Sequence, residues 1–172
     1  MIAPRRSPER DRVLGMIAAR LLSPGSKLKT TRSLKATSLP ETLGIEGATE
    51  DQLYDAMDWL LERQPAIEKR LAAKHLEPCG LVLYDLSSTW VEGTCCPLAA
   101  RGYSRDGKSD KLQVNFGLLT DDEGRPISVS VYRGNTADPA TVQDQVKKLK
   151  TDFGIDLVVF VGDRGMVTQT QI

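Results

Sequence analysis

The sequence predicts two parts, an all-helical unit over residues 1–78 and an α/β unit over residues 79–172. Two observations support this division. Apolar residues recur at helical spacing through the first part, whereas from Leu81 onward they form unbroken runs or alternate strictly with polar residues, as in strands. The segment at residues 77–80, Glu-Pro-Cys-Gly, separates the two patterns and is the expected boundary.

The composition is that of an ordinary globular protein. Of the 172 residues, 40% are hydrophobic and 27% are charged, and the net charge is zero. No apolar stretch approaches the ~18 residues that span a bilayer, and the N-terminus lacks the apolar segment of a secretory signal. The three cysteines are odd in number and two are adjacent, which disfavours a disulfide framework. We therefore expect a cytoplasmic protein without a membrane partner.

The first helix is predicted to begin at Ser7-Pro8-Glu9, where a capping residue precedes a proline at the first helical position. It is expected to end at residues 23–25, Ser-Pro-Gly, and its apolar stripe consists of Val13, Leu14, Ile17, Ala18 and Leu21. Residues 26–47 are basic and rich in Ser and Thr, and they predict short helices with breaks at Pro40 and Gly44.

A capping box at residues 49–52, Thr-Glu-Asp-Gln, is predicted to open the next helix. The apolar face of that helix is expected to consist of Leu53, Met57, Leu60 and Leu61. Pro65 is expected to end it, because proline lacks an amide hydrogen and clashes with the preceding turn. A further helix with Ile67 and Leu71 is predicted to run to about Leu76.

Residues 81–86, Leu-Val-Leu-Tyr-Asp-Leu, are apolar except for Asp85. An apolar run without alternation favours a strand that is buried on both faces of a sheet. An unpaired carboxylate inside such a strand is costly, so we expect Asp85 to be compensated, and a bound cation is one candidate. The same arrangement recurs at residues 157–163, where an apolar run is followed by Asp163.

The intervening residues predict a hairpin and a helix. Apolar and polar residues alternate over residues 112–118 and again over 127–131, which predicts two half-buried strands joined by a turn at 121–124. Asp138 followed by Pro139 is expected to cap a helix with a basic last turn, carrying Val142, Val146 and Leu149 on one stripe. Residues 134–136, Gly-Asn-Thr, are expected to form a turn before it.

The predicted order is therefore strand, strand, strand, helix, strand, which is how a ribonuclease H-like fold begins. In that topology the first and fourth strands are neighbours, so Asp85 and Asp163 would emerge side by side. Two converging carboxylates form a hard-oxygen site suited to Mg²⁺ or Mn²⁺. Two such ions about 3.5–4 Å apart can assist phosphodiester cleavage. Both aspartates could instead be structural, each capping the turn that follows its strand.

Several segments together give the chain a family resemblance. It resembles the DDE transposases of the IS1634 group, within the broader IS4 type, over almost its whole length. Besides the strands around Asp85 and Asp163, the matching segments are residues 16–27 (Met-Ile-Ala-Ala-Arg-Leu-Leu-Ser-Pro-Gly-Ser-Lys), 53–60 (Leu-Tyr-Asp-Ala-Met-Asp-Trp-Leu), 101–108 (Arg-Gly-Tyr-Ser-Arg-Asp-Gly-Lys) and 134–138 (Gly-Asn-Thr-Ala-Asp).

The resemblance implies metal-dependent DNA cleavage and strand transfer at the terminal repeats of an insertion sequence. It implies that Asp85 and Asp163 are catalytic ligands of Mg²⁺ or Mn²⁺, that target DNA is a partner, and that the full-length protein is a homodimer. The family's third acidic residue is a glutamate within a Tyr-Arg-Glu-Lys segment, but no glutamate follows Asp163 here. We therefore expect an N-terminal fragment that is inactive by itself. It would consist of a helical DNA-binding or dimerisation unit, residues 1–78, and an incomplete ribonuclease H-like catalytic core, residues 79–172.

The uneven charge indicates where DNA would be bound. Residues 1–40 contain nine Lys or Arg against two Asp or Glu, whereas residues 41–80 contain four against nine. A basic N-terminal segment favours contact with phosphates, and we choose Arg32 and Lys35 as the contact residues. Four side chains after the first strand could line a DNA path or belong to a solvated loop, and both readings stay open: Tyr103, Arg105, Lys108 and Lys111.

Other functions are compatible with the same sequence. A non-catalytic DNA-binding remnant could occupy the ends of the element or inhibit a full-length transposase. A different metal-dependent nuclease of the same fold is a second alternative, although the missing glutamate argues against it equally. A product without any function is a third. DNA affinity without cleavage would favour the remnant.

Overall fold

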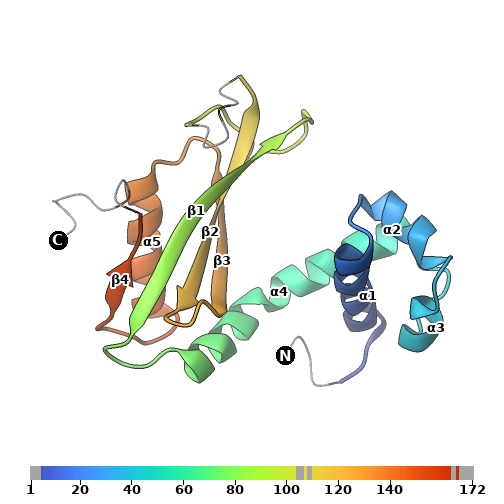
Figure 1. Cartoon of the computed structure of the whole chain (residues 1–172), viewed down its shortest axis with the longest axis horizontal. Coiled ribbons are helices and arrows are strands. Elements are labelled where there is room, and N and C mark those ends of the chain that lie inside the picture. Colours follow the sequence, from blue (N-terminus) through green and yellow to red (C-terminus); the bar gives the residue numbers. More distant parts are fainter. Residues whose placement is uncertain (1–4, 104–106, 108–109, 164–165, 167–172) are drawn as a thin grey trace. The chain divides into compact units, whose positions relative to one another are not determined.

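The structure is a computed structural model that describes residues 5–103, 107, 110–163 and 166. It consists of two compact units, residues 1–67 and 68–172, and the long helix α4 contributes residues to both (Figure 1). The division between the two units falls inside this helix. It comes before residues 77–80, where the sequence predicts the boundary from the change of helical to strand periodicity. Within the described residues no helix is long and apolar enough to cross a membrane.

The first unit consists of helices and their connections. Its helices are α1 (Pro8–Leu22), α2 (Lys27–Leu34), α3 (Leu39–Leu43) and the first part of α4 (Glu50–His75). The predicted start of α1 is confirmed, because the Ser7 hydroxyl accepts a hydrogen bond from the amide of Arg10 at 3.2 Å. The predicted capping box is confirmed too, since Thr49 and Gln52 exchange side-chain-to-amide hydrogen bonds of 3.2 and 3.3 Å.

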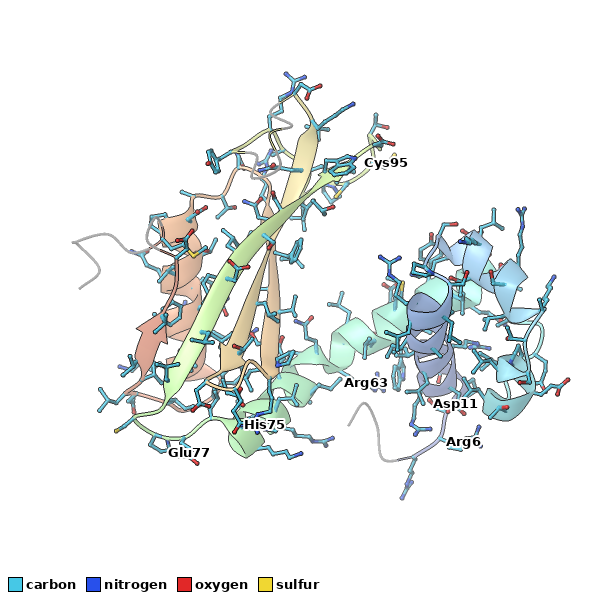
Figure 2. The ribbon with its side chains drawn as sticks, in the orientation of Figure 1. Arg6, Asp11, Arg63, His75, Glu77 and Cys95 are labelled. Carbon is cyan, nitrogen blue, oxygen red and sulfur yellow. The ribbon has the colours of Figure 1, made fainter. Side chains whose placement is uncertain are left out.

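A buried carboxylate joins the start of α1 to the residues around it. Asp11 accepts hydrogen bonds from the side chains of Arg6, at 3.0 Å, and Arg10, at 2.9 Å (Figure 2). The Arg6 guanidinium also donates to the carbonyl of Leu43, at 3.0 Å, at the end of α3. These contacts fix the chain before α1 against α3.

Helix α4 continues through Pro65, so the predicted break at this residue is wrong. A proline inside a helix removes one backbone hydrogen bond and costs roughly 3 kcal/mol. The packing of both flanking segments offsets this cost. Leu53 and Ala56 are buried before the proline, and Glu68 and Ala72 are buried after it.

The second unit is built on a four-stranded mixed sheet. Its elements are β1 (Leu81–Val91), β2 (Leu112–Asp121), β3 (Pro126–Arg133), α5 (Asp138–Thr151) and β4 (Val159–Val161). The strand order is β3-β2-β1-β4, with β1–β2 and β2–β3 antiparallel and β1–β4 parallel. The predicted element order and the predicted pairing of the first and last strands are thus confirmed. The last strand is shorter than predicted, because it begins at Val159 and leaves Leu157 exposed.

One face of the sheet forms the core of this unit. Its buried apolar residues are Val82, Tyr84, Leu86, Leu119, Val142, Leu149 and Met166, of which Val142 and Leu149 belong to α5 (Figure 1). Helix α5 begins after Ala137, which has no side-chain acceptor, so the prediction that Asp138 is the capping residue is wrong. The turn predicted at residues 134–136 is confirmed by the hydrogen bond from the amide of Thr136 to the carbonyl of Arg133, at 2.9 Å.

The alternation in β2 has the opposite sense to the predicted one. Gln113, Asn115 and Gly117 are buried, whereas the apolar residues between them are half-buried or exposed. The Gln113 amide donates to the carbonyls of Tyr103 and Gly134, both at 2.8 Å. The side of β2 that faces the core is therefore polar, because its side-chain amides donate hydrogen bonds to backbone carbonyls of the connecting loops.

The turn between β2 and β3 is organised by a buried carboxylate. Asp121 accepts hydrogen bonds from the amides of Glu123, at 3.1 Å, and Arg125, at 2.8 Å, and from the Arg125 guanidinium. Burial by itself raises the pKa of Asp121, but the hydrogen bonds and positive charge of Arg125 outweigh burial, so the pKa is lowered. The ionised form of Asp121 is thus part of the folded turn.

Candidate functional site

Asp85 lies in β1 on the sheet face opposite the core. Its neighbours along the strand, Tyr84 and Leu86, are buried against α5, whereas Asp85 itself is exposed. The expectation of a strand buried on both faces is therefore wrong. Within the described part of the chain, one face of β1 is open, and the Asp85 carboxylate is solvated there without a compensating partner in the core.

The parallel pairing of β1 and β4 brings Asp163 level with Asp85. The last register pair is Leu83 with Val161, and each aspartate follows two residues later in its own strand direction. The preceding residues are also neighbours, because a Cβ placed on Gly162 would lie 3.6 Å from the carbonyl oxygen of Tyr84. Asp163 is exposed, like Asp85. The two carboxylates, separated by 78 positions in sequence, thus lie at corresponding register positions, Asp85 in the middle of β1 and Asp163 two residues after the end of β4.

The surface around Asp85 is unusually apolar. Its partner in β2 is Leu118, which in turn pairs with Val129 of β3. Several apolar side chains on the four strands are more than a third exposed: Leu81, Phe116, Val129, Val131, Val159 and Val161. The candidate site therefore consists of two carboxylates at the margin of an open apolar sheet face.

Ser87 is a neighbour of Asp85 that the sequence reasoning did not single out. Its hydroxyl donates to the Asp85 carboxylate at 3.5 Å, which is a long hydrogen bond. The signal that could have found it is the period of two in a strand, which puts residues 85 and 87 on the same face. Ser87 thus places a second hard oxygen next to the carboxylate.

Asp85 and Asp163 are the two carboxylates that the pairing of β1 with β4 brings to the open sheet face. Among residues 5–103, 107, 110–163 and 166, no three His, Cys, Asp or Glu side chains lie together as a metal-binding group. Mg²⁺ is commonly bound through only one or two carboxylates, with water completing its octahedron. A pair of carboxylates is thus a ligand set of the size that Mg²⁺ uses.

The predicted DNA-contact residues, Arg32 and Lys35, are exposed at the C-terminal end of α2. Neither makes an ion pair with any residue that the structure describes. The exposed Lys29 lies on the same helix. These side chains belong to the helical unit, whereas both aspartates belong to the sheet unit.

The second group of possible DNA contacts is only partly described. Tyr103 and Lys111 are exposed. Arg105 and Lys108 lie outside the described residues, as do Arg164 and Gly165 of the predicted turn after the last strand. Of this group, only Tyr103 and Lys111 have a described place in the fold.

Comparison of this chain with protein-family models, with curated proteins and with solved structures finds no match. The fold is therefore described by its own elements, as an α/β arrangement with a four-stranded mixed sheet and one helix on the core face.

Proposed function

We propose that the sheet unit is the beginning of a ribonuclease H-like core for metal-dependent phosphodiester chemistry on DNA, of the kind that DDE transposases perform. The observation that carries this proposal is the parallel pairing of β1 with β4, which aligns Asp85 and Asp163. Carboxylates at corresponding positions of two adjacent chain segments provide the hard-oxygen ligands that Mg²⁺ and Mn²⁺ require.

In this proposal Asp85 and Asp163 each supply a carboxylate oxygen to a divalent cation, and the Ser87 hydroxyl lies next to Asp85. When bound, Mg²⁺ supplies Lewis-acid polarisation of a phosphate oxygen and lowers the pKa of a bound water. Both carboxylates are exposed, so an ion that they held would be accessible to a substrate as large as DNA. None of residues 164–172 is acidic, so a third carboxylate is not provided there.

Mn²⁺ binding is the direct test of the two-carboxylate site, because its free ion is measured by electron paramagnetic resonance. We expect one weak site per chain that Asp85→Asn and Asp163→Asn each abolish. Asp58→Asn is a matched control, since Asp58 is an exposed carboxylate on a helix of the other unit. Equal Mn²⁺ binding by the wild type and by both site variants would refute the site.

A second candidate function, DNA binding without catalysis, is favoured by one further observation. Arg32 and Lys35 are exposed on α2 without ion-pair partners among the described residues, so both cations are available to phosphates. This function does not depend on Asp85 or Asp163, and it would hold for the chain even if metal binding were absent.

Fluorescence anisotropy with labelled duplex DNA, over a series of salt concentrations, tests the DNA contact. Each phosphate contact contributes about −0.9 to the slope of log K against log salt. Arg32→Ala with Lys35→Ala is therefore expected to weaken binding and to flatten the slope by about 1.8. Lys69→Ala, an exposed lysine on α4, is the control. An unchanged slope in the double variant would exclude α2 as the contact.

A further inference from the structure

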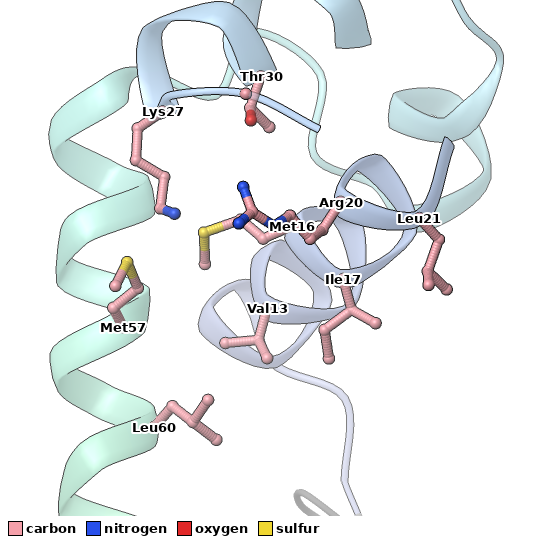
Figure 3. A pocket seen from close by; sticks show the side chains of 10 residues that line it. Val13, Met16, Ile17, Arg20, Leu21, Lys27, Thr30, Met57 and Leu60 are labelled. Carbon is pink, nitrogen blue, oxygen red and sulfur yellow. The ribbon is translucent and has the colours of Figure 1, made fainter. Parts of the chain in front are cut away.

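The helical unit contains an open groove between α1, α2 and α4 that neither proposed function uses. Its volume is about 490 Å³, within the range of about 300–1,000 Å³ that is typical of small-molecule sites. Figure 3 shows Met16, Arg20 and Lys27 pointing into the space between these helices, with Met57 and Leu60 on the α4 side. The groove is therefore large enough for a small organic ligand.

Most of the described residues that line the groove are apolar, and several of them are in contact with water. Ile17, Leu21 and Met57 belong to the apolar stripes that the sequence predicts on two helices, yet their exposed fractions are 47%, 80% and 41%. Of the stripe on α1, only Val13 is fully buried. A ligand that covered the exposed side chains would remove apolar surface from water, which is favourable in proportion to the area covered.

Two cations border this apolar surface. Arg20 of α1 and Lys27 of α2 make no ion pair with any residue that the structure describes. None of the described residues that line the groove is acidic. Like charges that converge over an apolar surface repel each other, so an anionic group between them would be favourable. A guanidinium can also donate two parallel hydrogen bonds, which match the two oxygens of a carboxylate.

The apolar surface and the two cations together select one class of ligand. A phosphate or an inorganic anion would neutralise the cations but leave the apolar side chains in water, whereas a neutral hydrocarbon would leave the cations unpaired. We propose that the groove binds a small amphiphilic carboxylate, an alkyl chain that ends in a carboxylate. The carboxylate lies between Arg20 and Lys27, and the alkyl chain lies against Met57 and Leu60. This inference does not depend on the metal chemistry or the DNA contact proposed above.

Methionine methyl groups report on the groove directly. Met16 and Met57 line it, whereas Met166 is buried in the core of the sheet unit and serves as an internal control. The full chain is isotope-labelled at its methionine methyl groups and titrated at neutral pH with octanoate, octanol or butanoate, and the chemical shifts are followed by NMR. We expect the signals of Met16 and Met57 to shift in a saturable way and that of Met166 to stay unchanged.

The three ligands separate the contribution of the charge from that of the alkyl chain. Octanoate should bind at least about tenfold more tightly than octanol, because only the carboxylate forms charge-assisted hydrogen bonds with the two cations. Octanoate should also bind at least about tenfold more tightly than butanoate, since each methylene that becomes buried contributes about fourfold in affinity.

The variant Arg20→Gln with Lys27→Gln should remove the advantage of octanoate over octanol. Lys69→Gln with Arg70→Gln is the matched control, because it removes an exposed lysine and an exposed arginine on the part of α4 that belongs to the other unit. The control should bind octanoate like the wild type. Circular dichroism verifies that each variant retains its helices, and the comparison of octanoate with octanol in the wild type tests the proposal without any substitution.

The outcomes that would overturn the proposal are specific. They are equal affinities of the wild type for octanoate and octanol, or an advantage of octanoate that persists in the Arg20→Gln and Lys27→Gln variant. Shifts that do not saturate, or that Met166 shows equally, would overturn it by showing unspecific binding. A response of Met16 and Met57 to dilution of the chain or to duplex DNA, without a response to octanoate, would assign the groove to a second copy or to nucleic acid instead.

Discussion

Glu68 offers a sharp test of how the end of α4 is anchored on the sheet unit. Its carboxylate accepts a hydrogen bond from the amide of Val129 at 3.1 Å, and its other oxygen lies 2.6 Å from the ammonium of Lys148. The exposed fraction is 7% for the Glu68 side chain and 17% for that of Lys148. Glu68 thus connects α4 to β3 and α5 through a buried ion pair.

The substitution Glu68→Ala leaves a largely buried ammonium and a strand amide without this acceptor. Breaking a buried pair from one side costs about 3–5 kcal/mol in the free energy of unfolding. Lys148→Met removes the cation while keeping an apolar stem, so the double variant is expected to be less destabilised than the sum of the single variants, by roughly 1–3 kcal/mol. Urea unfolding is followed by the fluorescence of Trp90, in a Trp59→Phe background so that the signal reports on β1.

The control is Glu62→Ala on the same helix. The Glu62 carboxylate is 76% exposed and 3.6 Å from Arg63, and such surface pairs contribute about 0–1 kcal/mol. A loss of less than about 1 kcal/mol for Glu68→Ala would refute the reasoning, as would strict additivity in the double variant.

Three further predictions concern stability. Gly117→Ala places a methyl group against the buried ring of Tyr84 and should lower the free energy of unfolding by about 1–3 kcal/mol, whereas Gly93→Ala, with no atom closer than 4.0 Å, should have little effect in the same urea assay. Because the pKa of Asp121 is lowered in the folded state, its carboxylate adds to the free energy of unfolding above the unfolded pKa of about 3.9, and this contribution is lost as the pH falls. Asp121→Asn should therefore flatten the decrease of the free energy of unfolding at acid pH. Burial and a hydrogen bond to a carboxylate raise the pKa of Tyr132, so its contribution to the free energy of unfolding is present below about pH 10 and lost above it. Tyr132→Phe should therefore flatten the decrease of the free energy of unfolding at alkaline pH. An unchanged pH dependence in these variants would contradict the two pH assignments.

The local sequence determines where several elements begin. Ser7 with Pro8 starts α1, and Thr49 with Gln52 starts α4, because a side-chain acceptor next to an unpaired helix amide is a short-range interaction. The order of strands and helix in the second unit is also local information, since it follows from the change of hydrophobic period along the chain.

The hydrophobic pattern of the sequence does not by itself align Asp85 with Asp163, because the alignment depends on how the strands pair. Helix α5 carries the chain from β3 at one edge of the sheet to β4 at the other edge, where β4 pairs in parallel with β1. The sequence pattern predicts that each aspartate lies near the C-terminal end of a strand, which is wrong for Asp85, because β1 continues for six more residues to Val91. That both side chains are solvated follows from the open face of the sheet, which no periodicity reveals.

Only the tertiary structure decided which apolar residues are covered. In β2 the polar residues Gln113 and Asn115 point to the core, because loop carbonyls at that position require hydrogen-bond donors. In α1 and α4 the exposed Leu21 and Leu61 follow the same helical periodicity as buried residues. Hydrophobic period identifies an element and its faces, but burial depends on which partner each face meets. Helix α4 likewise continues through Pro65 because packing on both sides of the proline outweighs a local preference of a few kcal/mol.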